Sequence, residues 1–440
     1  MTSHIPPNAR FTALYHRNFT LLWTGLLVSN IGTWMQNVAQ AWLVLQITNS
    51  PLWLGLLGLS FAIPMIALPL LGGVVVDRVH RIRLLYITQT GMLLNALILA
   101  ILTWTGVINV WHILITSFIG SVLLAFDNPA RQALIPDLVP PRDLLNALSL
   151  NSATYNGAAL VGPAIAGALL APLGAGSLFF LNSVSYIAVI IALLFLRGAR
   201  THSGGTHRSL GESVTRGLSF ALRDPMIRVL LLLSVVASFF GRSYQMLLPA
   251  FAQDIFHSGS EGYGILLSSA GAGALIGAFG LAWLREIKKQ GALLIASGLV
   301  FGFVLVGFAE CTTIGVGAGL LLVVGITSTA FGTIIATFLQ LLTPDELRGR
   351  VMSLYAITLI GVPSLGALIS GSVAQALGGV QGSPRAVLIG AIIVVAVLTL
   401  VTRRFWFMDS VVKPVLKTEA DQITMPGHNS PRVETDDTDA

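Results

Sequence analysis

The densest group of charged side chains in the sequence lies between two long apolar stretches, in residues 72–85, GGVVVDRVHRIRLL. Asp77, Arg78, Arg81 and Arg83 fall within seven positions. A carboxylate among guanidinium groups forms charge-assisted hydrogen bonds, which can hold two parts of a molecule in one conformation. The sequence shows no nucleophile with a nearby base, no metal-ligand cluster and no phosphate-binding loop. The chemistry of this group is therefore ionic, and we expect no enzyme and no cofactor.

Arg242 is the only charged residue that we place deep within an apolar stretch. A charge inside a membrane is costly and usually marks a functional site. A structural alternative stays open, in which Arg242 extends toward the membrane surface or pairs with Asp254. None of the 19 Asp and Glu residues falls near the middle of an apolar stretch, so the sequence shows no proton-carrying acid.

Other polar residues recur at helical spacing inside two of the apolar stretches. One stripe consists of Asn30, Thr33, Asn37 and Gln40, and the other contains Ser238, Arg242 and Gln245. Amide and hydroxyl groups on one helix face can bind a polar substrate. They can equally bond to a neighbouring helix and only hold a bundle together, and the sequence leaves both interpretations open.

The elements that position these residues follow from the composition. Apolar residues make up 54% of the 440 residues and charged residues only 10%, with a mean hydropathy of +0.81. A soluble domain carries about 25% charged residues, so lipid is the expected solvent for most of this chain. Apolar runs long enough to cross a bilayer as helices recur along the sequence. We place twelve of them, at residues 19–46, 53–76, 84–104, 111–127, 147–170, 177–196, 226–253, 263–284, 291–309, 313–340, 350–375 and 386–402.

The distribution of basic residues predicts the orientation of these spans. With both termini in the cytoplasm, all but two of the 25 Lys and Arg residues fall in cytoplasmic segments. The two exceptions are Arg242 and Arg385. This is the asymmetry that the positive-inside rule describes. The net charge of +6 is thus topological and gives no reason to expect a nucleic-acid partner.

The polar segments divide the chain into two bundles. We expect a cytoplasmic N-terminal tail (1–18), a six-helix bundle (19–196), a cytoplasmic linker (197–225), a second six-helix bundle (226–402) and a disordered cytoplasmic tail (403–440). The two bundles also repeat one another in sequence. A shift of 209 residues aligns Gly32 with Gly241 and Gly55 with Gly264, and a shift of 204 aligns Gly157, Gly162 and Gly167 with Gly361, Gly366 and Gly371.

Two parallel six-helix repeats are the architecture of major facilitator transporters. Residues 73–85 resemble the loop signature of this superfamily, with Gly73, Asp77, Arg78, Arg81 and Leu85 matching and His80 replacing the usual glycine. Residues 18–55 and 127–152 resemble the bacterial enterobactin-exporter and macrolide-efflux branch. Residues 157–167, GAALVGPAIAG, resemble in part the Gly-Pro motif of proton-coupled drug exporters, where Gly162, Pro163 and Gly167 fit and Ala158 and Ala166 replace glycine.

The resemblance implies roles for the residues above. It implies a latch in which Asp77 lies at the N-terminus of the eleventh helix and Arg81 pairs with Asp127, which stabilises the outward-facing state and must break on opening inward. The simpler alternative is that the arginines of the loop only anchor its orientation. Because helices one, four, seven and ten line the cavity in the family, both polar stripes become candidates for substrate contact.

The sequence as a whole predicts an all-α protein of the bacterial cytoplasmic membrane that exports a small organic molecule by alternating access. The resemblance implies a drug-like or siderophore-like substrate, exchange against protons, and a monomer in the lipid bilayer. The alternatives are a lysophospholipid or metabolite transporter of the same fold and, outside this class, a membrane-embedded enzyme or a sensor.

Overall fold

The computed structural model describes residues 11–68, 80–196, 219–283 and 290–405, and within these ranges the regular structure is helical. The first half of the chain forms α1 (Arg17–Thr48), α2 (Pro51–Ala67), α4 (Arg81–Trp104), α5 (Val110–Leu138) and α6 (Leu144–Leu194). The second half forms α8 (Pro225–Val236), α9 (Tyr244–Ala250), α10 (Gly259–Trp283), α11 (Gln290–Ala309), α12 (Ile314–Leu342), α13 (Asp345–Ala376) and α14 (Ser383–Phe405).

Short elements connect or interrupt these helices. Single 3₁₀ turns are η1 (Thr12–Tyr15), η2 (Pro141–Asp143) and η5 (Gly379–Gly382). Two π-helical turns, η3 (Ala237–Gly241) and η4 (Phe251–Ile255), flank α9. The predicted linker and the two predicted tails lie mostly outside the described residues, as do Gly73, Asp77 and Arg78 of the charged loop.

Nine helices in the described ranges are long and apolar enough to cross a membrane. One of them, the 54-residue stretch Pro141–Leu194, contains the fifth predicted span and all but the last two residues of the sixth. Gly174 interrupts this stretch with a φ of +74°, a left-handed conformation that glycine adopts readily. Gly174 lies at one end of the helical bundle, called the Gly174 end, and η2 lies at the opposite end, called the η2 end.

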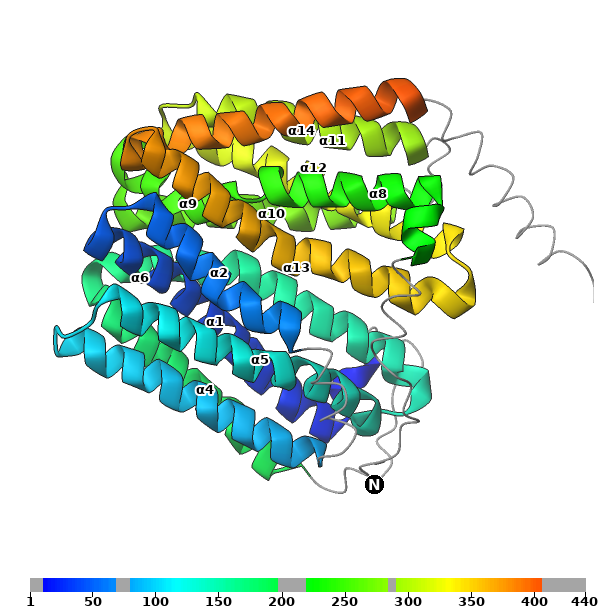
Figure 1. The fold of residues 1–440 in the computed structure, drawn as a ribbon. Coiled ribbons are helices and arrows are strands. Elements are labelled where there is room, and N and C mark those ends of the chain that lie inside the picture. The colour runs from blue at the N-terminus through cyan, green and yellow to red at the C-terminus, as the bar shows by residue number, and fades with distance from the viewer. Residues whose placement is uncertain (1–10, 69–79, 197–218, 284–289, 406–440) are drawn as a thin grey trace, which may run out of the picture.

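The helices form two groups that correspond to the two halves of the chain (Figure 1). Across the boundary between the groups, α2 packs on α13 and α6 packs on α10. A Cβ atom added to Gly264 of α10 would lie 2.7 Å from the carbonyl oxygen of Pro163 in α6. A Cβ atom added to Gly55 of α2 would lie 2.8 Å from the carbonyl oxygen of Ala367 in α13. Gly55 and Gly264 are repeat-related, so both crossings use the same close backbone approach.

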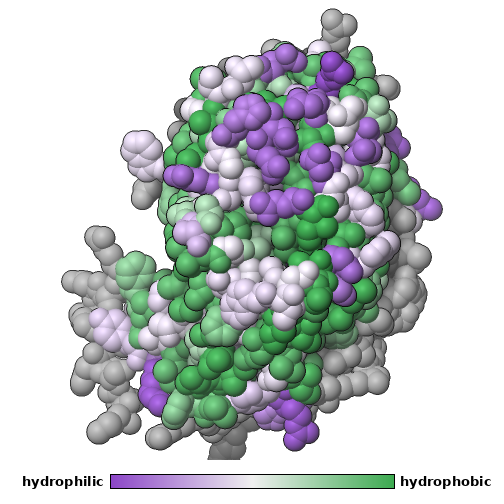
Figure 2. All heavy atoms as spheres, turned by 90° about the vertical axis from the view of Figure 1, so that its left-hand side faces the viewer, coloured by the Kyte–Doolittle hydropathy of each residue, from purple (hydrophilic) through white to green (hydrophobic). Residues whose placement is uncertain are grey.

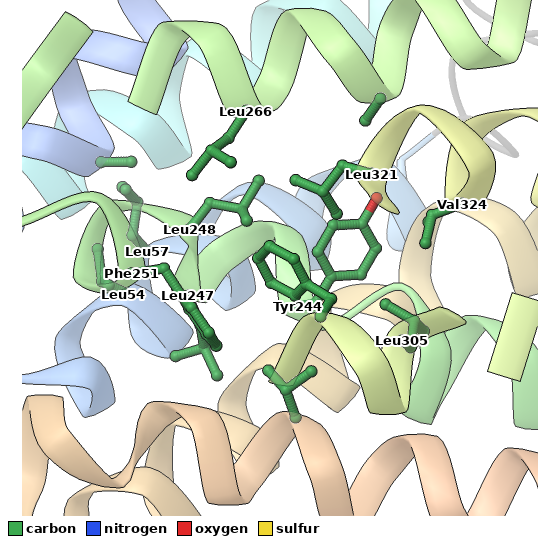
Figure 3. Close-up of a cluster of buried hydrophobic side chains, with 14 of the residues drawn as sticks. Leu54, Leu57, Tyr244, Leu247, Leu248, Phe251, Leu266, Leu305, Leu321 and Val324 are labelled. Carbon is green, nitrogen blue, oxygen red and sulfur yellow. The ribbon is translucent and has the colours of Figure 1, made fainter. Parts of the chain in front are cut away.

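A continuous apolar core joins the two groups near the Gly174 end (Figure 3). Tyr244, Leu248 and Phe251, from α9 and the turn after it, pack in the same cluster as Leu54 and Leu57 of α2. Each of these side chains is at least 95% buried. The two halves are therefore held together at this end by buried apolar surface, which stabilises a contact without directional bonds.

Hydrophilic side chains gather on the outside of the same end, in its upper part, over the C-terminal half (Figure 2). Apolar side chains cover much of the rest of that face. Large apolar residues such as Ile98, Trp104, Phe303 and Leu400 are also exposed on the flanks of the helices. Exposed apolar flanks between polar ends are what a lipid environment requires.

Candidate functional site

A cavity of about 450 Å³ lies within the N-terminal half. Its walls come from α1, α2, α4, α5 and α6, and Ile360 of α13 closes one side. All four residues of the α1 stripe, Asn30, Thr33, Asn37 and Gln40, line this cavity. The structure thus brings this predicted group together. Amide side chains on the other helices add to it: Asn95, Asn128, Gln132, Asn151 and Asn156.

Helix α5 is longer than the sequence predicts, and its additional residues bring further polar groups to the cavity. The helix begins at a capping box, in which the Asn109 side chain accepts a hydrogen bond from the backbone N–H of His112 at 3.1 Å. It then continues through Pro129 and Pro136 and ends before Pro140. Since α5 extends eleven residues beyond the predicted span 111–127, residues that we expected in a loop lie on a helix instead.

Asp127 and Arg131 form a buried ion pair one helical turn apart on α5. Asp127 is fully buried, and its other oxygen accepts hydrogen bonds of 2.8 Å from Thr88 and from Gln89 of α4. Arg131 borders the cavity with 13% of its side chain exposed. Sequence reasoning missed Arg131 because it placed the residue outside the membrane. The i,i+4 spacing of Asp127 and Arg131 within an amide-rich segment was the available signal.

The pair between Arg81 and Asp127, which is expected for the outward-facing state, is not formed in this structure. Arg81 Nη1 donates to Asp137 Oδ2 and to the carbonyl oxygen of Ala133, each at 2.8 Å. Asp127 is already paired with Arg131, which is closer in the chain and lies on the same helix face. Arg81 therefore ties the start of α4 to the end of α5, within one half of the molecule.

Some of the predicted cavity residues also bond to neighbouring helices. Thr33 Oγ1 lies 3.1 Å from the hydroxyl of Tyr186 on α6 and donates to the carbonyl oxygen of Ser29. Gln40 differs, because its buried Nε2 has no hydrogen-bond partner among the described residues. An unpaired buried donor costs free energy unless a ligand or water satisfies it. Gln40 is thus the member of the α1 stripe that has a buried polar atom without a partner among the described residues.

The second stripe is arranged differently from the first. Ser238 and Arg242 line a cavity of only about 40 Å³, together with Tyr355 of α13. Gln245 lines neither cavity. Arg242 directly follows the π-turn η3, where the Arg242 N–H donates to the carbonyl oxygen of Ala237 at 3.0 Å. Such turns inside a helix often mark functional sites.

Arg242 does not pair with Asp254 as the structural alternative expected. It has no ion pair or side-chain hydrogen bond to another described residue. It lines the small cavity with Leu359 of α13, and the next residue, Ile360, borders the large cavity. Tyr155 lines the large cavity and contacts Trp34 edge to face, with ring centroids 6.3 Å apart. Arg131 and Arg242 therefore border two neighbouring cavities, one in each half.

The Gly-Pro segment of α6 forms helix contacts. A Cβ atom added to Gly162 would lie 2.5 Å from Cβ of Trp34 on α1, and one added to Gly167 would lie 2.7 Å from Cα of Gly264 on α10. Pro163 contributes the carbonyl oxygen that approaches Gly264. These three residues therefore hold α6 against one helix from each half, and they do not line the large cavity.

Repeat-related halves of a helical membrane bundle beside a polar cavity are the architecture of secondary transporters. The chain belongs to the family described as "Transmembrane secretion effector", a branch of the major facilitator superfamily, which matches residues 8–425. It is a multi-pass protein of the bacterial inner membrane and belongs among the efflux-type members of the superfamily.

Characterised relatives cover most of the chain. The staphyloferrin A transporter of Staphylococcus aureus (strain NCTC 8325 / PS 47) is 26% identical, over 79% of this chain and 87% of its own length. The multidrug efflux pump Tap of Mycolicibacterium fortuitum is 25% identical, over 80% of this chain and 88% of its own. The macrolide efflux protein A of Streptococcus pyogenes is 24% identical, over 65% and 71%.

Solved transporter structures share the fold. A bacterial homologue of the human lysosomal transporter Spinster, in an inward-facing and unoccupied conformation, superposes with a TM-score of 0.69 at 14% identity, over 93% of this chain and 99% of that chain. The nucleoside transporter NupG superposes with a TM-score of 0.72 at 13% identity, over 88% and 99%. At these identities the likeness concerns the fold alone.

Proposed function

We propose that the protein exports a small organic molecule across the cytoplasmic membrane by alternating access, as a monomer and in exchange for inward-moving protons. The observation that carries this proposal is the polar cavity of about 450 Å³ beside an apolar core that joins the two halves near the Gly174 end. The names of the efflux relatives support the outward direction. No enzymatic step is part of the proposal.

The proposed topology has twelve spans with both termini in the cytoplasm. As one straight helix, the stretch of 54 residues would be about 80 Å long, which is far more than one crossing of a ~30 Å core needs. The break at Gly174 therefore supports two crossings in this stretch. The 32-residue α1 and the 17-residue α2 supply the two further crossings that precede α4.

In this topology the Gly174 end faces outward, and the described conformation is inward-facing. At that end the Ser50 hydroxyl, which precedes α2, donates to Gln375 Oε1 of α13 at 2.7 Å. This hydrogen bond joins the two halves and must break when the cavity opens outward. We propose that the apolar core of Figure 3 separates at the same time.

A cross-link across this hydrogen bond tests alternating access. Cys311 is the only native cysteine and is buried, so new cysteines at positions 50 and 375 can be labelled selectively. We expect oxidation, or a short bifunctional thiol reagent, to abolish transport by the Ser50→Cys/Gln375→Cys variant, and reduction of the disulfide to restore it. Each single-cysteine variant serves as a matched control. Full transport by the cross-linked protein would contradict the proposal.

Direction and coupling need a separate experiment. A deletion strain and a complemented strain are compared for accumulation of a panel of antibiotics and siderophores, with and without a protonophore. We expect lower accumulation in the complemented strain and loss of that difference when the protonophore is added. Accumulation that rises in the complemented strain would show import, and efflux that persists with the protonophore would exclude proton exchange.

A further inference from the structure

The charge of the transport cavity points to the class of its substrate. Among the described residues that line it, Arg131 is the only charged side chain, and the lining includes no Asp or Glu. A carboxylate that faces the substrate is the strongest partner for a cation in a low-dielectric site, where an unpaired cation is costly. A guanidinium group instead matches the planar, two-oxygen geometry of a carboxylate.

Asp127 does not supply the missing carboxylate. It is fully buried, and its two oxygens accept hydrogen bonds from Thr88, Gln89 and Arg131. Arg131, by contrast, borders the cavity with 13% of its side chain exposed, while its Nη2 donates to Asp127. A ligand can therefore reach the guanidinium group while the carboxylate stays inside the protein.

Arg242 adds a second positive charge from the other half of the molecule. It has no ion-pair partner among the described residues, and it lines the small cavity together with Leu359 of α13, whose neighbour Ile360 borders the large cavity. An unpaired guanidinium within a membrane-spanning bundle is costly. An anion bound between the two halves would remove this cost.

We propose that the substrate is an organic anion with at least two carboxylate groups, bound by Arg131 on α5 and Arg242 after η3, and that cations are excluded. The proposal rests on the proposed transport function and narrows its substrate class. The amide groups around Arg131, such as Asn128 and Gln132, are suited to the hydroxyl and carbonyl groups of such a molecule. Because the two arginines belong to different halves, substrate binding would also draw the halves together.

The test measures binding, which does not depend on transport or its direction. The purified full-length protein in detergent is titrated with citrate, with inorganic phosphate and with tetraphenylphosphonium, and thermal unfolding reports binding. We expect citrate to raise the unfolding temperature and the other two to leave it unchanged. Stabilisation by tetraphenylphosphonium, equal stabilisation by phosphate, or no effect of citrate would overturn the proposal.

Variants then assign the binding to the two arginines. Arg242→Gln should weaken citrate binding by about tenfold or more, the effect of losing a charged hydrogen bond. Arg131→Gln alone leaves Asp127 unpaired and risks misfolding, so the Asp127→Asn/Arg131→Gln double variant is used for this site. Arg131→Lys should retain part of the affinity. Arg228→Gln, at an exposed position on α8, is the matched loss of charge and should bind citrate normally.

Unchanged citrate binding in both the Arg242→Gln variant and the double variant would overturn the assignment. The outcome is independent of the export proposal. Efflux of a cationic compound without citrate binding would leave the exporter intact and refute the anion site. Citrate binding to a protein that shows no efflux would support the anion site and refute the export proposal.

Discussion

Helices α5 and α12 are the fourth and tenth apolar segments of the chain and occupy repeat-related places, yet they serve their halves differently. Helix α5 carries Asp127, Arg131 and Asp137 and lines a cavity of about 450 Å³. Helix α12 has no charged residue in its 29 positions and borders a cavity of only about 40 Å³. The repeat thus preserves the path of the backbone while the two halves have different interiors.

Glycine placement explains the smaller cavity of the C-terminal half. A Cβ atom added to Gly325 of α12 would lie 2.1 Å from the carbonyl oxygen of Ala270, and one added to Gly273 of α10 would lie 1.9 Å from that of Leu322. The backbones of α10 and α12 are therefore in direct contact. On α5, Gly120 faces the cavity, and the nearest atom to an added Cβ is Asn95 Nδ2 at 3.3 Å. Gly273 and Gly325 thus let α10 and α12 pack without a space between them, whereas Gly120 of α5 leaves room for polar side chains.

The buried ion pair of α5 has no counterpart in α12, and its substitution should have the largest effect on the free energy of unfolding. Asp127→Asn or Arg131→Gln alone should lower the free energy of unfolding by about 3–5 kcal/mol, because each leaves an uncompensated buried charge. The Asp127→Asn/Arg131→Gln double variant should recover most of that loss but not transport. Chemical denaturation in detergent measures the free energy of unfolding of the wild type, the two single variants and the double variant. Additive effects of the two substitutions would show that the two groups do not interact.

The glycine contrast predicts unequal effects of one substitution in the two halves. Gly325→Ala should lower the free energy of unfolding by about 1–3 kcal/mol, because its methyl group would overlap the α10 backbone. Gly120→Ala should stay within about 1 kcal/mol of the wild type, since the gain in helix propensity offsets the contact with Asn95. Both variants are compared by thermal unfolding. Equal losses would mean that α5 is packed as tightly as α12.

Sequence patterns predicted the elements of this fold better than its charged contacts. Apolar length located the helices, and helical spacing grouped Asn30, Thr33, Asn37 and Gln40 on the face that lines the cavity. The glycine repeat predicted related positions, and the structure places Gly55 and Gly264 at equivalent crossings. These features depend on period and residue size, which a sequence displays directly.

The charged contacts depend on competition between partners, which spacing alone does not resolve. Prolines and charges made residues 127–138 resemble a loop, whereas packing retains them in α5. On that helix Arg131 lies one turn from Asp127 and pairs with it, and Arg81 pairs with Asp137 instead. The π-turn before Arg242 has no counterpart in the regular helix α1, so the repeat could not predict it.

Gln40 offers a smaller test of whether the α1 stripe binds substrate or only stabilises the bundle. Its Nε2 is buried without a partner among the described residues, so Gln40→Met should raise the free energy of unfolding by about 1 kcal/mol. We expect the same variant to lose affinity for the substrate. Thr48→Val, at the end of α1 and outside the cavity lining, is a matched polar-to-apolar control. A destabilised Gln40→Met variant with normal affinity would favour the bundle-stabilising role.

The smallest expected effect concerns the η2 end, where His16 Nε2 lies 2.8 Å from Asp143 Oδ2. The hydrogen bond with His16 is the main cause that lowers the pKa of the Asp143 carboxyl in the folded protein. A lowered pKa stabilises the fold at pH values above the ordinary carboxyl pKa of about 3.9. This contribution is lost as the pH falls through the lowered value, because the carboxyl is then protonated in both states.

Asp143→Asn should therefore be slightly less stable than the wild type near pH 5, with the difference shrinking and then disappearing as the pH falls below about 3.9. Thermal unfolding of both proteins in detergent across this range measures it. Asp345→Asn is a suitable control, because Asp345 pairs with Arg348 at an exposed site where ion pairs contribute little. A difference between Asp143→Asn and the wild type that persists at the lowest pH would assign the effect to packing. The interaction would then attach the N-terminal segment to the α5–α6 connection through shape and not through charge.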